Sequence, residues 1–332
     1  MSIAPDRLYH LGGVPVCSGG HDDYAGWWDS ETWFIDYKNG TRGPLQGKQD
    51  MKYPGKDLAD ALDNCTSGAT IYMREHTDPH LHGRDPREIT PYSTTALNWT
   101  IRQATHHVSI IGTGKIGVGG LASETLLRGY RGATTPILNI LGAYPTIENL
   151  CFKGDEYEPA TNCVNSLVSV SNYPEATQSG YAATINNCTF RTSASTNPYG
   201  ALRFETGYWN SVINSTFWKC AMGVFVGSAG NVNYNASIVG NDFIGLDTDV
   251  DADIRLGDCA NITIDNNNFQ HALPAHATGD KLKYIISVGT AATGTASNNF
   301  FATTEIDIDA ACTLIDIAAV ANKCSADTIW IK

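Results

Sequence analysis

An alternating run of acidic residues is the densest group of chemically active side chains in the sequence. Asp247, Asp249, Asp251 and Asp253 are separated by single residues, so an extended chain would place four carboxylates on one side. Ca²⁺ prefers oxygen ligands of this kind, which makes the run a candidate calcium site. The run lacks the glycine and the final glutamate of a twelve-residue calcium loop, and the alternative is four solvated side chains in a loop.

The same carboxylates also suit the hydrolysis of a polysaccharide. Glycosidases use two carboxyl groups roughly 5 to 9 Å apart, one of them as a proton donor. The candidates are Asp247 and Asp249 together with Glu205 and Asp242 from neighbouring segments. Because the chain has 34 acidic residues, such pairs also arise by chance, and these four are no more than catalytic candidates.

Two further groups of side chains could bind ligands. Tyr208, Trp209 and Trp218 carry flat rings that can stack on sugar rings, or can equally pack against neighbouring loops. The segment 75–85 holds three histidines and three acids, a mixture that suits Zn²⁺. It has no recognised metal-ligand spacing, so solvated loop histidines are the alternative.

The elements that must position these residues follow a repeat. Six segments share a phrase in which an apolar or β-branched residue is followed by Asn or a small residue and then by Phe. They are 147–152, 185–190, 212–217, 238–243, 264–269 and 295–300. The Phe residues are 38, 27, 26, 26 and 31 residues apart. A period near 26 with insertions is typical of a solenoid, in which each repeat buries its apolar face against its neighbours.

The repeat predicts an all-β protein, a single-stranded right-handed parallel β-helix over residues 51–332. Alternating apolar pairs such as Leu202 and Phe204 predict a second strand in each coil. The Phe residues should stack inside, and so should a ladder of Asn149, Asn187, Asn214 and Asn266. A capping helix is expected at about residues 57–65, with Asp57 as its N-cap. Residues 1–50 are predicted to form an N-terminal arm or attachment segment, and the alternative is that they cover the N-terminal edge of the same rod.

Composition and charge exclude several classes of protein. A net charge of −12 without a basic run argues against binding to nucleic acid. No stretch reaches the roughly 18 apolar residues of a membrane-spanning helix, so membrane insertion is not expected. The N-terminal residues lack the pattern of a secretory signal, which predicts synthesis in a cytosol. Cys151, Cys188 and Cys220 lie beside predicted core positions, and we expect buried free thiols.

The repeated phrase and the helix lead to a family resemblance. The segment 33–40, the helix Leu58-Ala59-Asp60-Ala61-Leu62 and the strand Ala69-Thr70-Ile71-Tyr72-Met73 precede the coils. This arrangement resembles the pectate-lyase-like right-handed β-helices, and more narrowly those of bacteriophage tailspikes and head spikes. The resemblance implies cleavage or binding of polysaccharide on the long flank of the rod, and for the viral members a homotrimer standing on the virion.

We therefore expect a bacteriophage virion structural protein. It would be a homotrimeric β-helical spike of tail or head, assembled in the host cytoplasm and displayed on the virion surface. It would contact either host surface polysaccharide or other capsid proteins, with residues 1–50 as the segment that contacts other virion proteins. It would require no cofactor apart from the calcium considered above. The alternative is a polysaccharide-cleaving enzyme, a depolymerase, lyase or glycoside hydrolase, which could be secreted.

Overall fold

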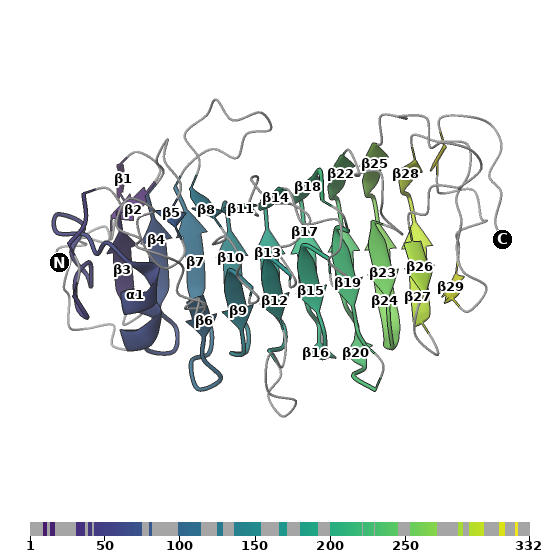
Figure 1. The fold of residues 1–332 in the computed structure, drawn as a ribbon, viewed down its shortest axis with the longest axis horizontal. Coiled ribbons are helices and arrows are strands. Elements are labelled where there is room, and N and C mark those ends of the chain that lie inside the picture. The colour runs from purple at the N-terminus through teal and green to yellow at the C-terminus, as the bar shows by residue number, and fades with distance from the viewer. Residues whose placement is uncertain are drawn as a thin grey trace, which may run out of the picture.

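The chain folds into a rod of stacked coils, with parallel strands running side by side along its length (Figure 1). The computed structural model describes residues 9–11, 14–16, 31–36, 39–41, 43–74, 80–81, 99–113, 125–128, 136–153, 166–170, 180–191, 200–220, 222–228, 230–244, 253–270, 285–287, 292–301, 312–315 and 323–324.

Three parallel sheets form the faces of the rod. The twelve-stranded sheet contains β3 (Thr32–Ile35), β4 (Thr70–Met73), β7 (Ser109–Gly112), β10 (Thr146–Glu148), β13 (Thr184–Asn186), β16 (Gly207–Tyr208), β17 (Ser211–Ile213), β20 (Asn233–Tyr234), β21 (Ser237–Val239), β24 (Cys259–Asp265), β27 (Ala292–Ser297) and β29 (Cys312–Ile315). The nine-stranded sheet contains β5 (His80–Leu81), β8 (Leu126–Arg128), β11 (Cys151–Lys153), β14 (Thr189–Arg191), β18 (Thr216–Trp218), β22 (Asp242–Ile244), β25 (Asn268–Gln270), β28 (Phe300–Phe301) and β30 (Lys323–Cys324). The seven-stranded sheet contains β6 (Trp99–Ile101), β9 (Leu138–Ile140), β12 (Val168–Val170), β15 (Leu202–Phe204), β19 (Val224–Val226), β23 (Ile254–Leu256) and β26 (Ile285–Ser287).

The predicted fold class is confirmed as an all-β, right-handed parallel β-helix. Within the described residues the one antiparallel pair of strands is β1 (Tyr9–Leu11) with β2 (Val14–Val16). β3 lies inside the segment 1–50 and pairs in parallel with β4. In the part of the chain that the structure describes, no helix is long and apolar enough to span a membrane.

The predicted capping helix is also confirmed, as α1 (Leu58–Asn64) at the N-terminal end of the rod (Figure 1). The carboxylate of Asp57 accepts a hydrogen bond of 2.9 Å from the backbone N–H of Ala59, and this bond satisfies a helix terminus that has no internal partner. Leu58, Ala61 and Leu62 are buried, so the helix lays its apolar face against the first coils.

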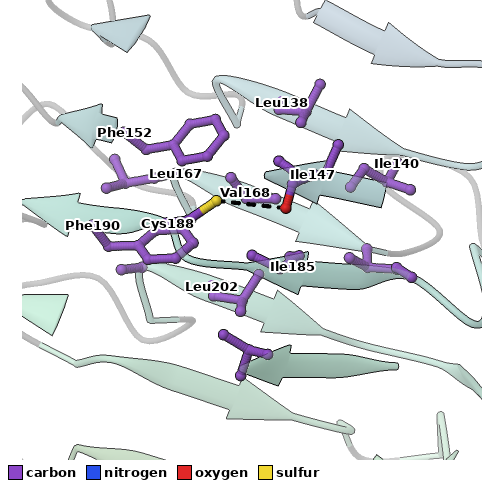
Figure 2. Packing of buried hydrophobic residues seen from close by; sticks show 14 of the residues in the cluster. Leu138, Ile140, Ile147, Phe152, Leu167, Val168, Ile185, Cys188, Phe190 and Leu202 are labelled. Atoms are coloured by element: carbon purple, nitrogen blue, oxygen red, sulfur yellow. Dashed lines mark hydrogen bonds between the residues drawn. The ribbon is translucent and has the colours of Figure 1, made fainter. Parts of the chain in front are cut away.

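The Phe stack forms the centre of the core. Phe190, Phe217, Phe243 and Phe269 stack with ring centroids 4.8 Å apart at each step and with interplanar angles of at most 9°. Phe152 continues the stack, 5.5 Å from Phe190, and Figure 2 shows these two rings beside aliphatic residues of the other sheets. Repetition of one side chain at one spacing gives every coil the same partner on both sides.

The sixth repeat is shifted by one residue from its predicted alignment. Phe301 lies opposite Phe269, whereas Phe300 lies opposite Asn268 and is 39% exposed. The inward position opposite Ile264 is taken by Ala296, a side chain too small to mark the alternation clearly in the sequence.

The predicted Asn ladder was wrong by one residue. Asn149, Asn187, Asn214 and Asn266 point outward from a turn at which their φ angles lie between +48° and +56°. Asn tolerates this left-handed conformation better than most residues because its short polar side chain bonds locally. The interior ladder is formed by the residues that follow, in the order Leu150, Cys188, Ser215, Asn241, Asn267 and Asn299.

Amides connect three coils in this interior ladder. The side-chain oxygen of Asn267 accepts two 3.0 Å bonds, one from the backbone N–H and one from the side-chain amide of Asn241. The side-chain amide of Asn267 donates to the carbonyl oxygen of Ile238 at 2.8 Å and to the side-chain oxygen of Asn299 at 3.0 Å. The amides therefore satisfy buried backbone groups as well as one another.

Asn267→Ala should lower the free energy of unfolding by about 3 kcal/mol or more, because it leaves buried donors and acceptors on two coils without partners. Urea unfolding followed by circular dichroism measures this change. Asn266→Gly is the matched control, since glycine adopts positive φ freely and the effect should stay within about 1 kcal/mol. Equal losses in the two variants would contradict the role of the ladder.

A buried carboxylate ties the N-terminal coils together. Glu31 is 5% exposed and accepts hydrogen bonds from the ammonium of Lys48 at 2.7 Å and from the hydroxyl of Thr66 at 2.7 Å. Burial alone would raise the pKa of Glu31, but these bonds and that from the Thr66 N–H outweigh burial and lower the pKa below its ordinary value of 4.5.

Stability at the N-terminal end should therefore depend on pH. Because the folded-state pKa of Glu31 is lowered, its ionised form stabilises the fold above pH 4.5, and this contribution is lost as the pH falls through the folded-state pKa. Glu31→Gln should lower the free energy of unfolding by about 1–2 kcal/mol at neutral pH. The difference between parent and variant should shrink in acid, and a difference that stays constant in urea titrations across pH would contradict this account.

Candidate functional site

One corner of the rod carries a row of aromatic side chains. The chain turns into the twelve-stranded sheet through a second left-handed position in each coil. These positions are His107, Tyr144, Ala182, Trp209, Asn235 and Asn261, with φ angles between +53° and +57°. The backbone N–H of Tyr144 donates to the carbonyl of Tyr181 at 2.9 Å, and that of Trp209 donates to the carbonyl of Tyr234 at 2.9 Å. Equivalent turns therefore stack from coil to coil.

We define the aromatic edge as the rings that this corner presents to solvent, namely His107, Tyr144, Tyr181, Tyr208, Trp209 and Tyr234. The rings of His107 and Tyr144 stack at 4.7 Å, and Tyr181 meets Tyr144 edge to face at 5.4 Å. Further along, Tyr208 stacks on Tyr234 at 5.2 Å and lies 5.7 Å from Trp209. The edge spans five successive coils, or about 19 Å at a coil spacing of about 4.8 Å.

These rings are exposed in spite of their size. Tyr144 is 45%, Tyr208 is 48% and Trp209 is 59% exposed. Tyr144 and Trp209 also hold left-handed backbone angles, which cost roughly 1–2 kcal/mol for a residue with a side chain. Asn235 and Asn261 fill the same corner on later coils. Folding alone therefore gives no reason for an exposed Trp at this position.

A column of hydroxyl groups runs beside the aromatic edge. We define the hydroxyl column as Thr32, Thr70, Ser109, Thr146, Thr184, Ser211, Ser237, Thr263 and Thr295. These residues face one another in register on successive strands of the twelve-stranded sheet. All are partly exposed. Each corner residue is followed by one inward residue and then by a hydroxyl, as in Trp209, Asn210 and Ser211, so the two rows are neighbours along five coils.

The structure separates the three sugar-stacking candidates of the sequence. Tyr208 and Trp209 belong to the aromatic edge, whereas Trp218 lies on β18 of the nine-stranded sheet. There its ring is contacted by the guanidinium of Arg191 at 5.5 Å and the ammonium of Lys219 at 5.1 Å. Sequence reasoning missed Tyr144, Tyr181 and Tyr234. Aligning the repeats on the Ser or Thr that follows each corner would have shown them.

The acidic candidates that the structure describes do not meet. Glu205 follows β15 of the seven-stranded sheet, and its carboxylate is bound by the guanidinium of Arg203 and by the Ser228 hydroxyl. Asp242 lies on β22 of the nine-stranded sheet, where it accepts a 2.9 Å bond from the side-chain amide of Asn268.

Most of the calcium and zinc candidates lie outside the part of the chain that the structure describes. Asp247, Asp249 and Asp251 lie outside the described residues, as do the side chains of the 75–85 segment. Asp253 is 3% exposed, and its backbone carbonyl accepts hydrogen bonds from the N–H groups of Gly223 and Val224. Among the described residues, no three His, Cys, Asp or Glu side chains lie close enough together to hold a metal ion.

The expected free thiols are confirmed. Cys151, Cys188 and Cys220 are buried and unpaired by disulfides. The Cys188 thiol donates to the carbonyl oxygen of Ile147 at 3.6 Å (Figure 2), and burial raises its pKa to about 12. This thiol stays protonated at neutral pH, so it is core packing and not a nucleophile.

Comparisons with known proteins indicate fold but not activity. No protein-family model matches the chain, and neither does any curated protein sequence. A solved structure described as Geobacillus virus E2 ORF18 superposes with a TM-score of 0.45 and 10% identity, covering 75% of this chain and 48% of that one. This chain thus spans about half the length of the viral protein.

Two polysaccharide lyases are also similar. The alginate lyase from Paenibacillus sp. str. FPU-7 gives a TM-score of 0.47 and 13% identity over 83% of this chain and 95% of that one. A rhamnogalacturonan lyase gives 0.32 and 9% identity over 89% of this chain and 87% of that one. The parallel β-helix of this chain is established by its own strand pairing. It fits both functions expected from the sequence and decides between neither.

Trp209→Asn should change the free energy of unfolding by less than about 1 kcal/mol, because relief of the left-handed backbone offsets the lost contact with Tyr208. Trp218→Asn is the matched control. It should destabilise by about 1–2 kcal/mol, since a strand position loses its ring and two cation contacts. Urea unfolding of the two variants beside the parent tests both values, and a larger loss for Trp209→Asn would show that the exposed ring supports the fold.

Proposed function

We propose that this protein is a glycan-binding β-helical spike of a bacteriophage virion, and that it binds surface polysaccharide along the aromatic edge. The observation that carries the proposal is the row of solvent-exposed rings on five stacked coils, which burial in the core does not explain. Flat apolar rings with polar rims suit the faces of sugars, which combine C–H surface with hydroxyl groups.

Binding without cleavage is the form of this function that the described residues favour. Cleavage by a pair of acids needs two carboxyl groups facing one substrate at roughly 5 to 9 Å. Glu205 and Asp242 lie on different sheets, and each is engaged by neighbouring side chains.

Assembly and location complete the proposal. We propose a homotrimer displayed on the virion surface and attached to other virion proteins through residues 1–50. Support for an attachment surface comes from Leu45 within this segment and from Met51 and Tyr53 directly after it, which are 61%, 37% and 59% exposed. Large exposed apolar side chains are typical of protein contacts. A trimer would also cover strand edges that a single rod leaves open.

The test combines mass, binding and cleavage on the full chain. Sedimentation should give three times the 35.8 kDa chain mass. In biolayer interferometry against a panel of bacterial surface polysaccharides, Trp209→Asn should weaken binding about tenfold, the effect of losing one stacked ring. Trp218→Asn should bind as the parent does. No reducing ends or unsaturated products should appear.

Each part of the proposal can fail separately. A monodisperse monomer would remove the trimer, and binding to no polysaccharide would remove the glycan function. Equal weakening in both Trp variants would move the site away from the aromatic edge. Release of cleavage products would make the protein an enzyme, and Asp247 and Asp249 would then be the first residues to substitute.

A further inference from the structure

The direction of a bound chain follows from the register of the coils. Tyr181, Tyr208 and Tyr234 occupy one position before equivalent strands on successive coils, and Tyr144 on the preceding coil occupies the next position along the chain. The hydroxyl column repeats at the same interval. A ligand lying across the coils would meet one ring and one hydroxyl. A ligand lying along the rod meets a new ring and a new hydroxyl at every step of about 4.8 Å.

The hydroxyl column beside the edge has hydrogen-bonding capacity to offer. The Ser211 hydroxyl lies 3.4 Å from both the Thr184 hydroxyl and the Ala183 carbonyl, which is a weak contact. The hydroxyls of Thr146 and Ser237 make no hydrogen bond with any residue that the structure describes. Each can donate to and accept from a sugar hydroxyl, as a neutral, adaptable partner.

The charge beside the two rows is neutral or negative. The residues two positions after the hydroxyl column form the next outward-facing column of the sheet. Glu148 and Asp265, which follow Thr146 and Thr263, place carboxylates in this column. The other described positions in that next column are Phe34, Tyr72, Ile111, Asn186, Ile213, Val239 and Ser297, so this column contains no Lys or Arg. His107, at one end, is the one member of the described edge and hydroxyl column that can become a cation.

Apart from His107, the described residues of the two rows and of the column beside them offer an acidic polysaccharide no positive partner. Its carboxylates would lose hydration beside Glu148 or Asp265 without gaining an ion pair, on a chain whose net charge is −12. The basic side chains Arg191 and Lys219 contact Trp218 on the nine-stranded sheet instead.

We infer that the aromatic edge and the hydroxyl column together bind an uncharged polysaccharide that lies lengthwise along the rod. This inference rests on the proposed glycan-binding function and specifies its ligand class. Rings stack on the sugars, the hydroxyl column bonds their edges, and the flanking carboxylates exclude polyanions by charge.

Matched probes separate charge from shape. Each acidic bacterial polysaccharide in the panel is tested beside its carboxyl-reduced form, in which every uronate has become a neutral sugar, and beside naturally neutral polysaccharides. Interferometry at 50 and 500 mM salt, about 14 and 4 Å in Debye length, reports the electrostatic part of binding. Neutral probes should bind with less than a twofold change between the two salts.

Four variants test whether the ligand contacts the hydroxyl column. Ser211→Val and Ser237→Val should each weaken binding three- to tenfold, and Ser211→Thr should restore it. Thr70→Val is the matched control, because Thr70 belongs to the hydroxyl column on a coil before the aromatic edge begins. Its affinity should equal that of the parent, and unchanged melting of all variants shows that the fold is intact.

The outcomes distinguish failure of this inference from failure of the proposed glycan-binding function on which it rests. Binding to neutral and carboxyl-reduced probes that depends on Trp209 and Ser211 supports the inference. Preference for the acidic probes with affinity that falls in high salt, and that still depends on Trp209, would overturn the inference and leave the glycan function standing. Binding to no probe would overturn both.

Discussion

Coil-to-coil register is the constraint on which the rest of this structure depends. Strands that stack about 4.8 Å apart in parallel can exchange all their hydrogen bonds only if every coil turns at the same places. Two left-handed positions per coil supply these turns, one at Asn149 and its equivalents and one at Tyr144 and its equivalents. Insertions are tolerated between strands, but a shift within a turn would move every following side chain to the opposite face. The Phe stack and the Asn ladder are results of this register, since like residues meet like residues along the rod.

The same register also aligns residues on the outer surface, where core packing does not require similar side chains to repeat. Inside the rod, a repeated Phe is stabilised by its neighbours on both sides. At the corner, a repeated Tyr or Trp remains largely in water, and for Trp209 it also holds an unfavourable backbone angle. Asn235 and Asn261 show that the chain has a better residue for the turn itself. Backbone strain that is not offset by burial of the side chain is characteristic of binding surfaces. For this reason the functional proposal rests on the aromatic edge.

The sequence was sufficient to predict the architecture. It was not sufficient to decide which of two adjacent residues takes a given turn or core position. The repeat, the capping helix and the Phe stack could be predicted because each depends on local periodicity and on side chains large enough to mark it. The Asn ladder could not be placed, since Asn266 and Asn267 are adjacent and identical, and only the stacked backbone decides which one takes the left-handed turn. Phe300 and Phe301 pose the same ambiguity. Of the site, Tyr208 and Trp209 were recognisable only as rings that could stack on sugars or pack against loops. Joining them with Tyr144 and Tyr181 requires the alignment of coils separated by up to 65 residues of sequence.

A rigid solenoid is well suited to hold the aromatic edge and the hydroxyl column in a fixed geometry. Binding a flexible polysaccharide costs conformational entropy, so affinity depends on how little the protein itself must reorganise. Hydrogen bonds between coils hold the backbone of the edge, such as those from the N–H groups of Tyr144 and Trp209 to the carbonyls of Tyr181 and Tyr234. Most of the side chains in the edge have only two rotatable bonds. The two carboxylates beside the hydroxyl column are likewise fixed by hydrogen bonds. Glu148 accepts from the side-chain amide of Asn186, and Asp265 accepts from the hydroxyl of Ser297. The protein thus presents stacked rings, hydroxyls and fixed negative charge in one geometry before any ligand arrives. Under the proposed function, selection among polysaccharides would follow from charge and spacing, with no conformational change in the rod.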